Sequence, residues 1–93
     1  LRASSIPLLV DFWASCCGPC RMMAPAFAAA ARDLEPDMRL AKVSTEEAPN
    51  LAQALDIRII PTLALFRDGR EVARQAGAMT AGGILAWARA AMR

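Results

Sequence analysis

All three cysteines of this 93-residue chain lie between positions 16 and 20, in the stretch Ser15-Cys16-Cys17-Gly18-Pro19-Cys20. Cysteines this close together cannot cross-link distant loops, so the chain is not a small scaffold held together by disulfides. It must fold around a hydrophobic core of its own, and its 56% hydrophobic and 22% charged residues are typical of a globular chain. We expect one domain, residues 1–93, with local chemistry at the cysteines.

Several functional classes are excluded or disfavoured by composition. The chain has no histidine, which excludes Cys–His and Ser–His–Asp catalysis and every zinc site that uses histidine. The arginines are spread along the chain from Arg2 to Arg93, so we expect no nucleic-acid partner. There is no signal-peptide pattern, and no apolar run approaches the roughly 18 residues that span a bilayer. We therefore expect no membrane partner and a cytoplasmic location.

Apolar periodicity and turn residues predict strands alternating with helices. We expect strands over 6–13, 38–44, 62–66 and 71–77, and helices over 18–34, 48–56 and from Thr80 onward. The two last strands flank Arg-Asp-Gly and suit a hairpin in which Gly69 has positive φ. Pro25 is expected to kink the first helix. The order β-α-β-α-β-β-α indicates an α/β fold with a mixed central sheet flanked by helices.

Cys17 and Cys20 fall where a buried strand gives way to a helix. Residues three apart on the first turn face the same way, close enough for an unstrained disulfide. The positive end of the helix dipole favours the thiolate of Cys17, whereas Cys20 lies one turn in and is more buried. The pair is typical of a redox dithiol. Half of a metal site, or two unreactive buried thiols, are the alternatives that this spacing leaves open.

Asp11 is a carboxylate within the apolar stretch Leu-Leu-Val-Asp-Phe-Trp-Ala. Burial there costs several kcal/mol unless the group is paired or protonated, so we expect a raised pKa. Such an acid beneath a dithiol can exchange a proton with the resolving cysteine. A solvated position at the edge of the sheet is the alternative.

Pro61 directly precedes an apolar, β-branched strand in Ile59-Ile60-Pro61-Thr62. A proline there either begins the strand in the ordinary trans form or marks a special turn. An Ile–Pro bond can adopt the cis form at modest cost, and the residues around Pro61 leave both forms open.

Together these blocks resemble the thioredoxin family. The likeness rests on Val-Asp-Phe-Trp-Ala-Ser-Cys-Cys-Gly-Pro-Cys-Arg-Met-Met-Ala-Pro, then Ile-Ile-Pro-Thr-Leu-Ala-Leu-Phe-Arg-Asp-Gly, then Ala-Gly-Ala-Met. It covers nearly the whole chain and implies the thioredoxin fold and a protein-disulfide reductase. Residues 42–62 are also similar to the bacterial thioredoxin 2 type, whose N-terminal zinc-binding segment is missing here.

The resemblance assigns the catalytic roles. It implies that Cys17 attacks client disulfides, that Cys20 resolves the mixed disulfide, and that Asp11 assists Cys20. The implied partners are disulfide-containing client proteins and an NADPH-dependent flavin reductase that reduces Cys17–Cys20 again. No bound cofactor and no metal are implied. Gly-Pro between the cysteines favours a reductant over an oxidant.

The resemblance also implies a surface on which clients dock and a residue that adjusts Asp11. The docking surface would comprise Trp13, Gly18, Pro19, Ile60, Pro61, Gly77 and Ala78, with the Ile60 backbone pairing to an extended client segment. The resemblance also implies that Pro61 follows a cis peptide bond and faces the active site. Lys42 matches a lysine that tunes Asp11 in the family. Judged by the sequence around it alone, Lys42 is a solvated residue at the end of a strand.

Cys16 departs from the family pattern, because most thioredoxins have tryptophan just before the attacking cysteine. We expect a small residue at a buried rim without a catalytic role. Regulation by glutathionylation or an intermolecular disulfide, and metal capture by three thiolates, are the alternatives. With redox-modified or metal-binding cysteines, the chain would be an interaction or chaperone module with a thioredoxin fold.

The start of the chain is the second departure. The family normally has another strand and helix before Leu-Leu-Val-Asp-Phe-Trp-Ala, and we expect both to be absent or truncated. The strand over 39–44 would then be an uncovered edge, open to pairing with a second copy of the chain.

Overall fold

The structure is a computed structural model that describes residues 6–92. Its elements follow the predicted order, with ends that coincide with the expected ones or differ from them by at most two residues. They are β1 (Leu8–Trp13), α1 (Gly18–Leu34), β2 (Arg39–Ser44), α2 (Pro49–Ala54), β3 (Thr62–Arg67), β4 (Arg70–Ala76) and α3 (Ala81–Ala91). The predicted fold class is confirmed.

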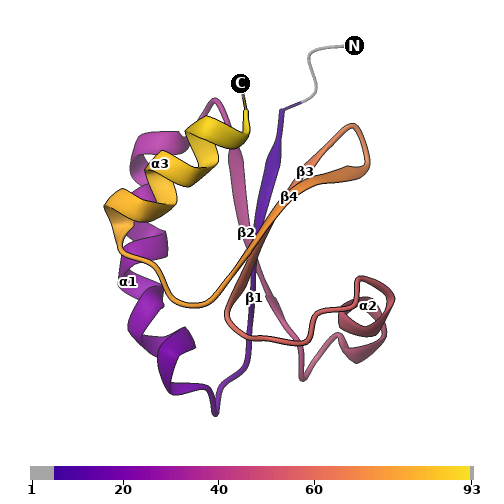
Figure 1. The fold of residues 1–93 in the computed structure, drawn as a ribbon. Coiled ribbons are helices and arrows are strands. Elements are labelled where there is room, and N and C mark those ends of the chain that lie inside the picture. Colours follow the sequence, from indigo (N-terminus) through magenta and orange to yellow (C-terminus); the bar gives the residue numbers. More distant parts are fainter. Residues whose placement is uncertain (1–5, 93) are drawn as a thin grey trace.

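The four strands form one mixed sheet in the order β2-β1-β3-β4 (Figure 1). β1 and β2 are parallel, and α1 supplies the crossover that parallel neighbours require. β3 runs antiparallel to β1 and forms a hairpin with β4. Within residues 6–92, β2 has no strand on its outer side, so its predicted position at an edge is confirmed.

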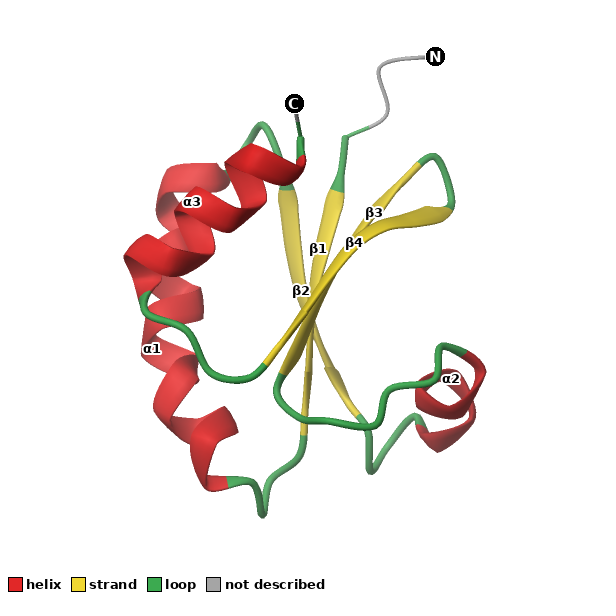
Figure 2. Cartoon of the chain, viewed as in Figure 1, coloured by secondary structure: helices red, strands yellow, loops and turns green. Residues whose placement is uncertain are grey.

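Most of the core lies on the face of the sheet that α1 and α3 cover (Figure 2). Leu9, Leu63 and Leu65 point from the strands into this layer and are fully buried. They meet side chains that recur at helical spacing on the two helices, which are Met23, Phe27, Ala30 and Leu34 of α1 and Ile84 and Ala88 of α3.

The opposite face has a smaller apolar cluster. Val10, Phe12 and Ala64 are buried there, and Leu55 and Ile57, which follow α2, pack against them. Figure 1 shows α2 alone on this side, near the end of the sheet at which α1 begins. The carboxyl end of β1 is thus enclosed by α1 on one side and α2 on the other.

Local sequence explains how several elements begin and end. Asp68 and Gly69 both have positive φ, 54° and 78°, which is the geometry of a two-residue hairpin turn with the right twist. Thr80 caps α3, because its Oγ accepts a hydrogen bond from the N–H of Gly83 at 3.0 Å. α1 continues through Pro25 as far as Leu34. The Ile60–Pro61 bond is cis, as predicted, and Glu35–Pro36 is a second cis bond that was not predicted.

Strand register brings distant segments to one end of the sheet. Phe12, near the end of β1, lies opposite Thr62 at the start of β3, and Thr62 lies opposite Ala76 at the end of β4. Trp13 is paired with Ser44 at the end of β2. The cysteine segment, the loop before β3 and the loop after β4 therefore meet at this end.

Candidate functional site

The cysteine segment begins with a tight turn between β1 and α1. The N–H of Cys17 bonds the carbonyl of Ala14 at 3.2 Å, which closes the turn. Cys17 is the N-cap of α1, with extended backbone (φ −93°, ψ 109°). Its Sγ accepts a hydrogen bond from the backbone N–H of Cys20 at 3.2 Å. The sulfur thus takes the place of the usual capping oxygen at the positive end of the helix.

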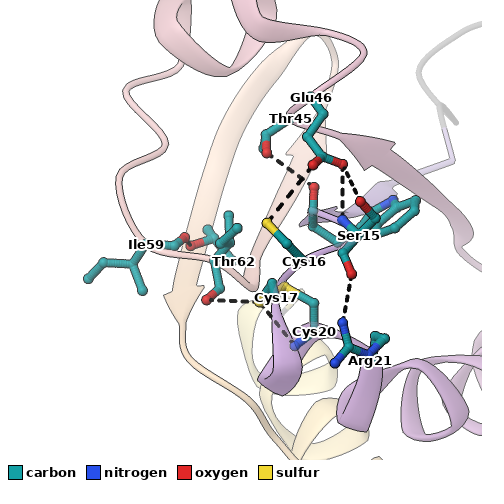
Figure 3. Close-up of a disulfide and its surroundings, with 11 residues drawn as sticks. Ser15, Cys16, Cys17, Cys20, Arg21, Thr45, Glu46, Ile59 and Thr62 are labelled. Carbon is teal, nitrogen blue, oxygen red and sulfur yellow. Dashed lines mark hydrogen bonds between the residues drawn. A yellow bond between two sulfur atoms is a disulfide. The ribbon is translucent and has the colours of Figure 1, made fainter.

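Cys17 and Cys20 form a disulfide, with their Cα atoms 5.2 Å apart (Figure 3). Cys17 is half-buried, whereas only 2% of Cys20 is exposed. The predicted pairing and the predicted difference in burial between the two sulfurs are confirmed. Gly18 and Pro19 lie between them at the surface, and a Cβ added to Gly18 would meet no atom within 4 Å.

Two further loops lie beside the disulfide. The Sγ of Cys17 is 3.7 Å from the carbonyl oxygen of Ile60, a distance at which a thiol can donate to it in the reduced state. Pro61 is buried, and its carbonyl accepts from the N–H of Gly77 at 2.8 Å. Gly77 has a φ of 95°, which glycine adopts without strain, and Ala78 follows it at the surface.

The carboxyl group of Asp11 is fully buried on the α1 side of the sheet, the same side as Leu9. Neither of its oxygens has a hydrogen-bond partner in the described part of the chain. Burial raises the pKa of Asp11 from its ordinary 3.8 to about 6, although the positive charge of Lys42 opposes the shift. The solvated alternative is thus excluded, and Asp11 can change its protonation state near neutral pH.

Lys42 lies opposite Asp11 in the parallel pairing of β1 and β2. Its ammonium group is 5.0 Å from the centre of the Trp13 ring, a cation–π contact. The side chain is exposed, as the sequence around it predicted, but it stands in the middle of β2. The predicted place at the end of a strand is wrong, because Lys42 is the fourth of the six residues of β2.

A polar network around Ser15 was not found in the sequence. The N–H and hydroxyl of Ser15 donate to one carboxylate oxygen of Glu46 at 3.0 and 2.8 Å, and its carbonyl accepts from Arg21 at 2.7 Å. These hydrogen bonds from Ser15 hold the pKa of Glu46 below its ordinary value. The partners are 31 and 6 residues from Ser15, and no spacing rule links the first of them to the turn.

Cys16 is a free, exposed thiol. Its Sγ lies 4.0 Å from the second carboxylate oxygen of Glu46, on the side facing away from the disulfide (Figure 3). The predicted place at a buried rim is wrong, since the turn directs this side chain outward. Between residues 6 and 92, no group of three or more acidic, cysteine or histidine side chains is placed to hold a metal ion.

An apolar groove of about 540 Å³ adjoins the site between the first half of α1 and the loop before α3. Met22, Met23, Ala78 and Met79 line it, and Met22 is 79% exposed.

Among the described residues, none of the helices is both long and apolar enough to cross a bilayer.

Comparison with known proteins gives one consistent family. The family model described as Thioredoxin matches residues 1–90. Two relatives named Thioredoxin 1, from Synechococcus elongatus and Nostoc sp., are 49% and 46% identical over 76 residues, covering 82% of this chain and 71% of each relative. A solved structure titled "Structure of a malarial protein" matches 96% of this chain and 100% of its own with a TM-score of 0.87. At 18% identity, that likeness shows the fold alone.

Proposed function

This chain belongs to the thioredoxin family and is a thiol–disulfide oxidoreductase, and on that premise we propose which of its atoms perform the exchange. Cys17 is the attacking thiolate and Cys20 the resolving thiol. The observation that carries this assignment is the difference between the two sulfurs. Cys17 caps α1 and is partly accessible, whereas Cys20 is buried one turn further along.

The exchange follows from these positions. In the reduced protein the Cys17 thiolate attacks one sulfur of a client disulfide, which breaks that bond and forms a mixed disulfide. The displaced client sulfur leaves as a thiolate and takes up a proton. Cys20, once deprotonated, attacks the sulfur of Cys17 and releases the second client thiolate. Two electrons pass to the client, and the Cys17–Cys20 disulfide seen here is the product.

We assign Asp11 the proton transfer that deprotonates Cys20. Its carboxyl group lies on the side of the sheet that α1 covers, and α1 carries Cys20. The pKa of about 6 makes it a base able to accept a proton near neutral pH. Lys42, across the β1–β2 pairing, keeps that pKa from rising further.

The surface around the disulfide is suited to an extended client segment. Gly18 follows Cys17 and has open space beside it, and the Ile60 carbonyl lies 3.7 Å from the Cys17 sulfur. The loop at Gly77 and Ala78 is joined to the same segment, because the Gly77 N–H donates to the Pro61 carbonyl. Trp13 precedes the turn, Pro19 follows it in the first turn of α1, and the buried Pro61 follows Ile60. We propose that these residues dock the client.

Reduction of Cys17–Cys20 after each turnover requires an electron donor. We propose an NADPH-dependent flavin reductase, with disulfide-containing proteins as clients, because this is the partnership that the family implies. A cytoplasmic location suits a dithiol that must be kept reduced.

We also propose a single domain over residues 1–93, supported by the family match to 1–90. We further propose that two copies of the chain pair through β2, which lies at the edge of the sheet.

The subtype is a separate matter. Both relatives reported above are named Thioredoxin 1, and they give no support to a thioredoxin 2 type. The chain is therefore assigned to the thioredoxin family without a subtype.

The experiment that tests the proposed function is a redox titration with mass-spectrometric mapping of the paired cysteines. We expect a reversible Cys17–Cys20 couple near the thioredoxin value of about −270 mV. A much less negative potential, or a pair that includes Cys16, would contradict a reductase with these roles and favour the interaction or chaperone module instead.

A further inference from the structure

The turn that presents Cys17 leaves two of its own backbone groups without partners inside the turn. Ala14 and Cys17 are its first and last residues, and their hydrogen bond closes it. In such a turn the N–H of the second residue and the carbonyl of the central peptide point outward. Rotation of the central peptide converts one turn type into another. Here these groups are the N–H of Ser15 and the carbonyl of the Ser15–Cys16 peptide.

Glu46 binds the first of these groups. One carboxylate oxygen accepts from both the N–H and the hydroxyl of Ser15, and the other lies 4.0 Å from the Cys16 sulfur. The adjacent Thr45 fixes the segment, since its N–H and hydroxyl both donate to the Trp13 carbonyl at 2.8 and 3.2 Å. The loop after β2 is thereby attached to the end of β1 and to the turn (Figure 3).

Arg21 binds the second group from the other side. Its guanidinium donates to the Ser15 carbonyl at 2.7 Å, while its backbone N–H donates to the Cys17 carbonyl at 3.1 Å in the first turn of α1. One residue therefore connects the central peptide of the turn to the helix that Cys17 caps. If that peptide rotated, the bond from Arg21 would be lost.

We propose that Glu46 and Arg21 are positioning residues that hold the Ala14–Cys17 turn from opposite sides and so fix the Cys17 sulfur for attack on a client disulfide. Neither touches the disulfide, and both act through Ser15. The sulfur's own contacts, the Cys20 N–H at 3.2 Å and the Ile60 carbonyl at 3.7 Å, depend on where the turn places Cys17. This inference rests on the proposed role of Cys17 as the attacking cysteine.

The test uses single variants of the full chain, each reduced and then mixed with a disulfide-containing substrate such as insulin. Loss of a hydrogen-bonded anchor should slow the attack by Cys17 about 3- to 10-fold in Glu46→Ala and in Arg21→Ala. Glu46→Gln should keep the wild-type rate, because its amide oxygen still accepts from Ser15. Glu46 and Arg21 hold the same turn, so the double variant should be slowed by less than the product of the two single effects.

Matched controls separate the turn from loss of charge. Glu47→Ala removes an exposed carboxylate next to Glu46, and the Glu47 side chain has no hydrogen bond or ion pair among residues 6–92. Arg32→Ala removes an exposed guanidinium of α1 that likewise has no such partner there, and it is the control for Arg21→Ala. Both should react at the wild-type rate. Amide hydrogen exchange gives a readout besides activity, since the Ser15 N–H should exchange faster in Glu46→Ala and be unchanged in Glu47→Ala.

Three results would overturn the proposal: a wild-type rate in both Glu46→Ala and Arg21→Ala, equal slowing in the control variants, or slowing in Glu46→Gln as great as in Glu46→Ala. Cys17→Ser keeps this failure distinct from failure of the proposed function. If Cys17→Ser still reduces the substrate, the role of Cys17 itself is wrong. If it is inactive while the variants of Glu46 and Arg21 react normally, only the positioning role is lost.

Discussion

The sulfur of Cys17 accepts a hydrogen bond from the backbone N–H of Cys20, 3.2 Å away across the first turn of α1. The same interaction stabilises negative charge on Cys17 once the disulfide is reduced, because backbone N–H groups and the helix dipole both favour an anion there. Cys20 has no comparable position, since it lies within the helix and is 2% exposed. One local geometry thus separates the roles of two chemically identical side chains.

Replacing either cysteine should therefore have different effects. Cys20→Ser keeps the attacking thiolate and removes the resolving one, so a mixed disulfide between Cys17 and the client should accumulate. Cys17→Ser should form no such adduct. Intact mass spectrometry under non-reducing conditions measures both, with Cys16→Ser as a control that behaves like the wild type. A stable client adduct on Cys17→Ser, mapped to Cys20, would reverse the assignment.

The buried Asp11 should make the protein less stable at neutral pH than it is in mild acid. Its pKa is about 6 in the folded protein and 3.8 ordinarily, so the folded state binds the proton more tightly. Stability from this group is complete below pH 3.8 and is lost as the pH rises towards 6. The loss amounts to about 3 kcal/mol.

Asp11→Asn should recover most of that loss. At pH 7 its free energy of unfolding should exceed that of the wild type by up to about 3 kcal/mol, with the difference shrinking towards pH 4. Urea denaturation at several pH values measures this, and client release by Cys20 should slow in the same variant. A difference that does not depend on pH would mean that Asp11 is ionised throughout.

Cys16 should be the thiol that reacts in the oxidised protein. It is exposed and free, whereas Cys17 and Cys20 are bonded to each other. Iodoacetamide should therefore label Cys16 alone before reduction and should label Cys17 as well afterwards, as peptide mapping would show. Cys16→Ser should remove the first label and leave the Cys17–Cys20 pair intact. Labelling of Cys17 or Cys20 without a reductant would argue against the pairing.

Thr80 should contribute measurably to the stability of α3. Its hydroxyl caps the helix by accepting from the Gly83 N–H, and alanine has no side-chain acceptor for that bond. Thr80→Ala should lower the free energy of unfolding by about 1 kcal/mol, and Thr80→Ser should lower it by much less. Thermal or urea unfolding measures both. Equal losses in the two variants would show that the methyl group, not the hydroxyl, matters.

The sequence by itself determined the features that depend on near neighbours along the chain. Strand and helix periodicity, the Asp68-Gly69 turn, the Thr80 cap and the placing of Cys17 and Cys20 at a strand–helix junction all follow from residues a few positions apart. Each is set by backbone sterics or by hydrogen bonds within one or two turns of the chain. They were enough to predict the element order and the redox pair.

Tertiary structure alone decided what surrounds that pair. The Ile60 carbonyl lies 43 residues from Cys17, and Glu46 lies 31 residues from Ser15, yet strand register brings both to the same end of the sheet. The outward direction of Cys16 depends on the same assembly. Such contacts depend on how the crossover and the hairpin align the strands, and sequence spacing carries no record of that alignment. Packing over the whole domain therefore decides how the cysteines are held and which thiol faces the solvent.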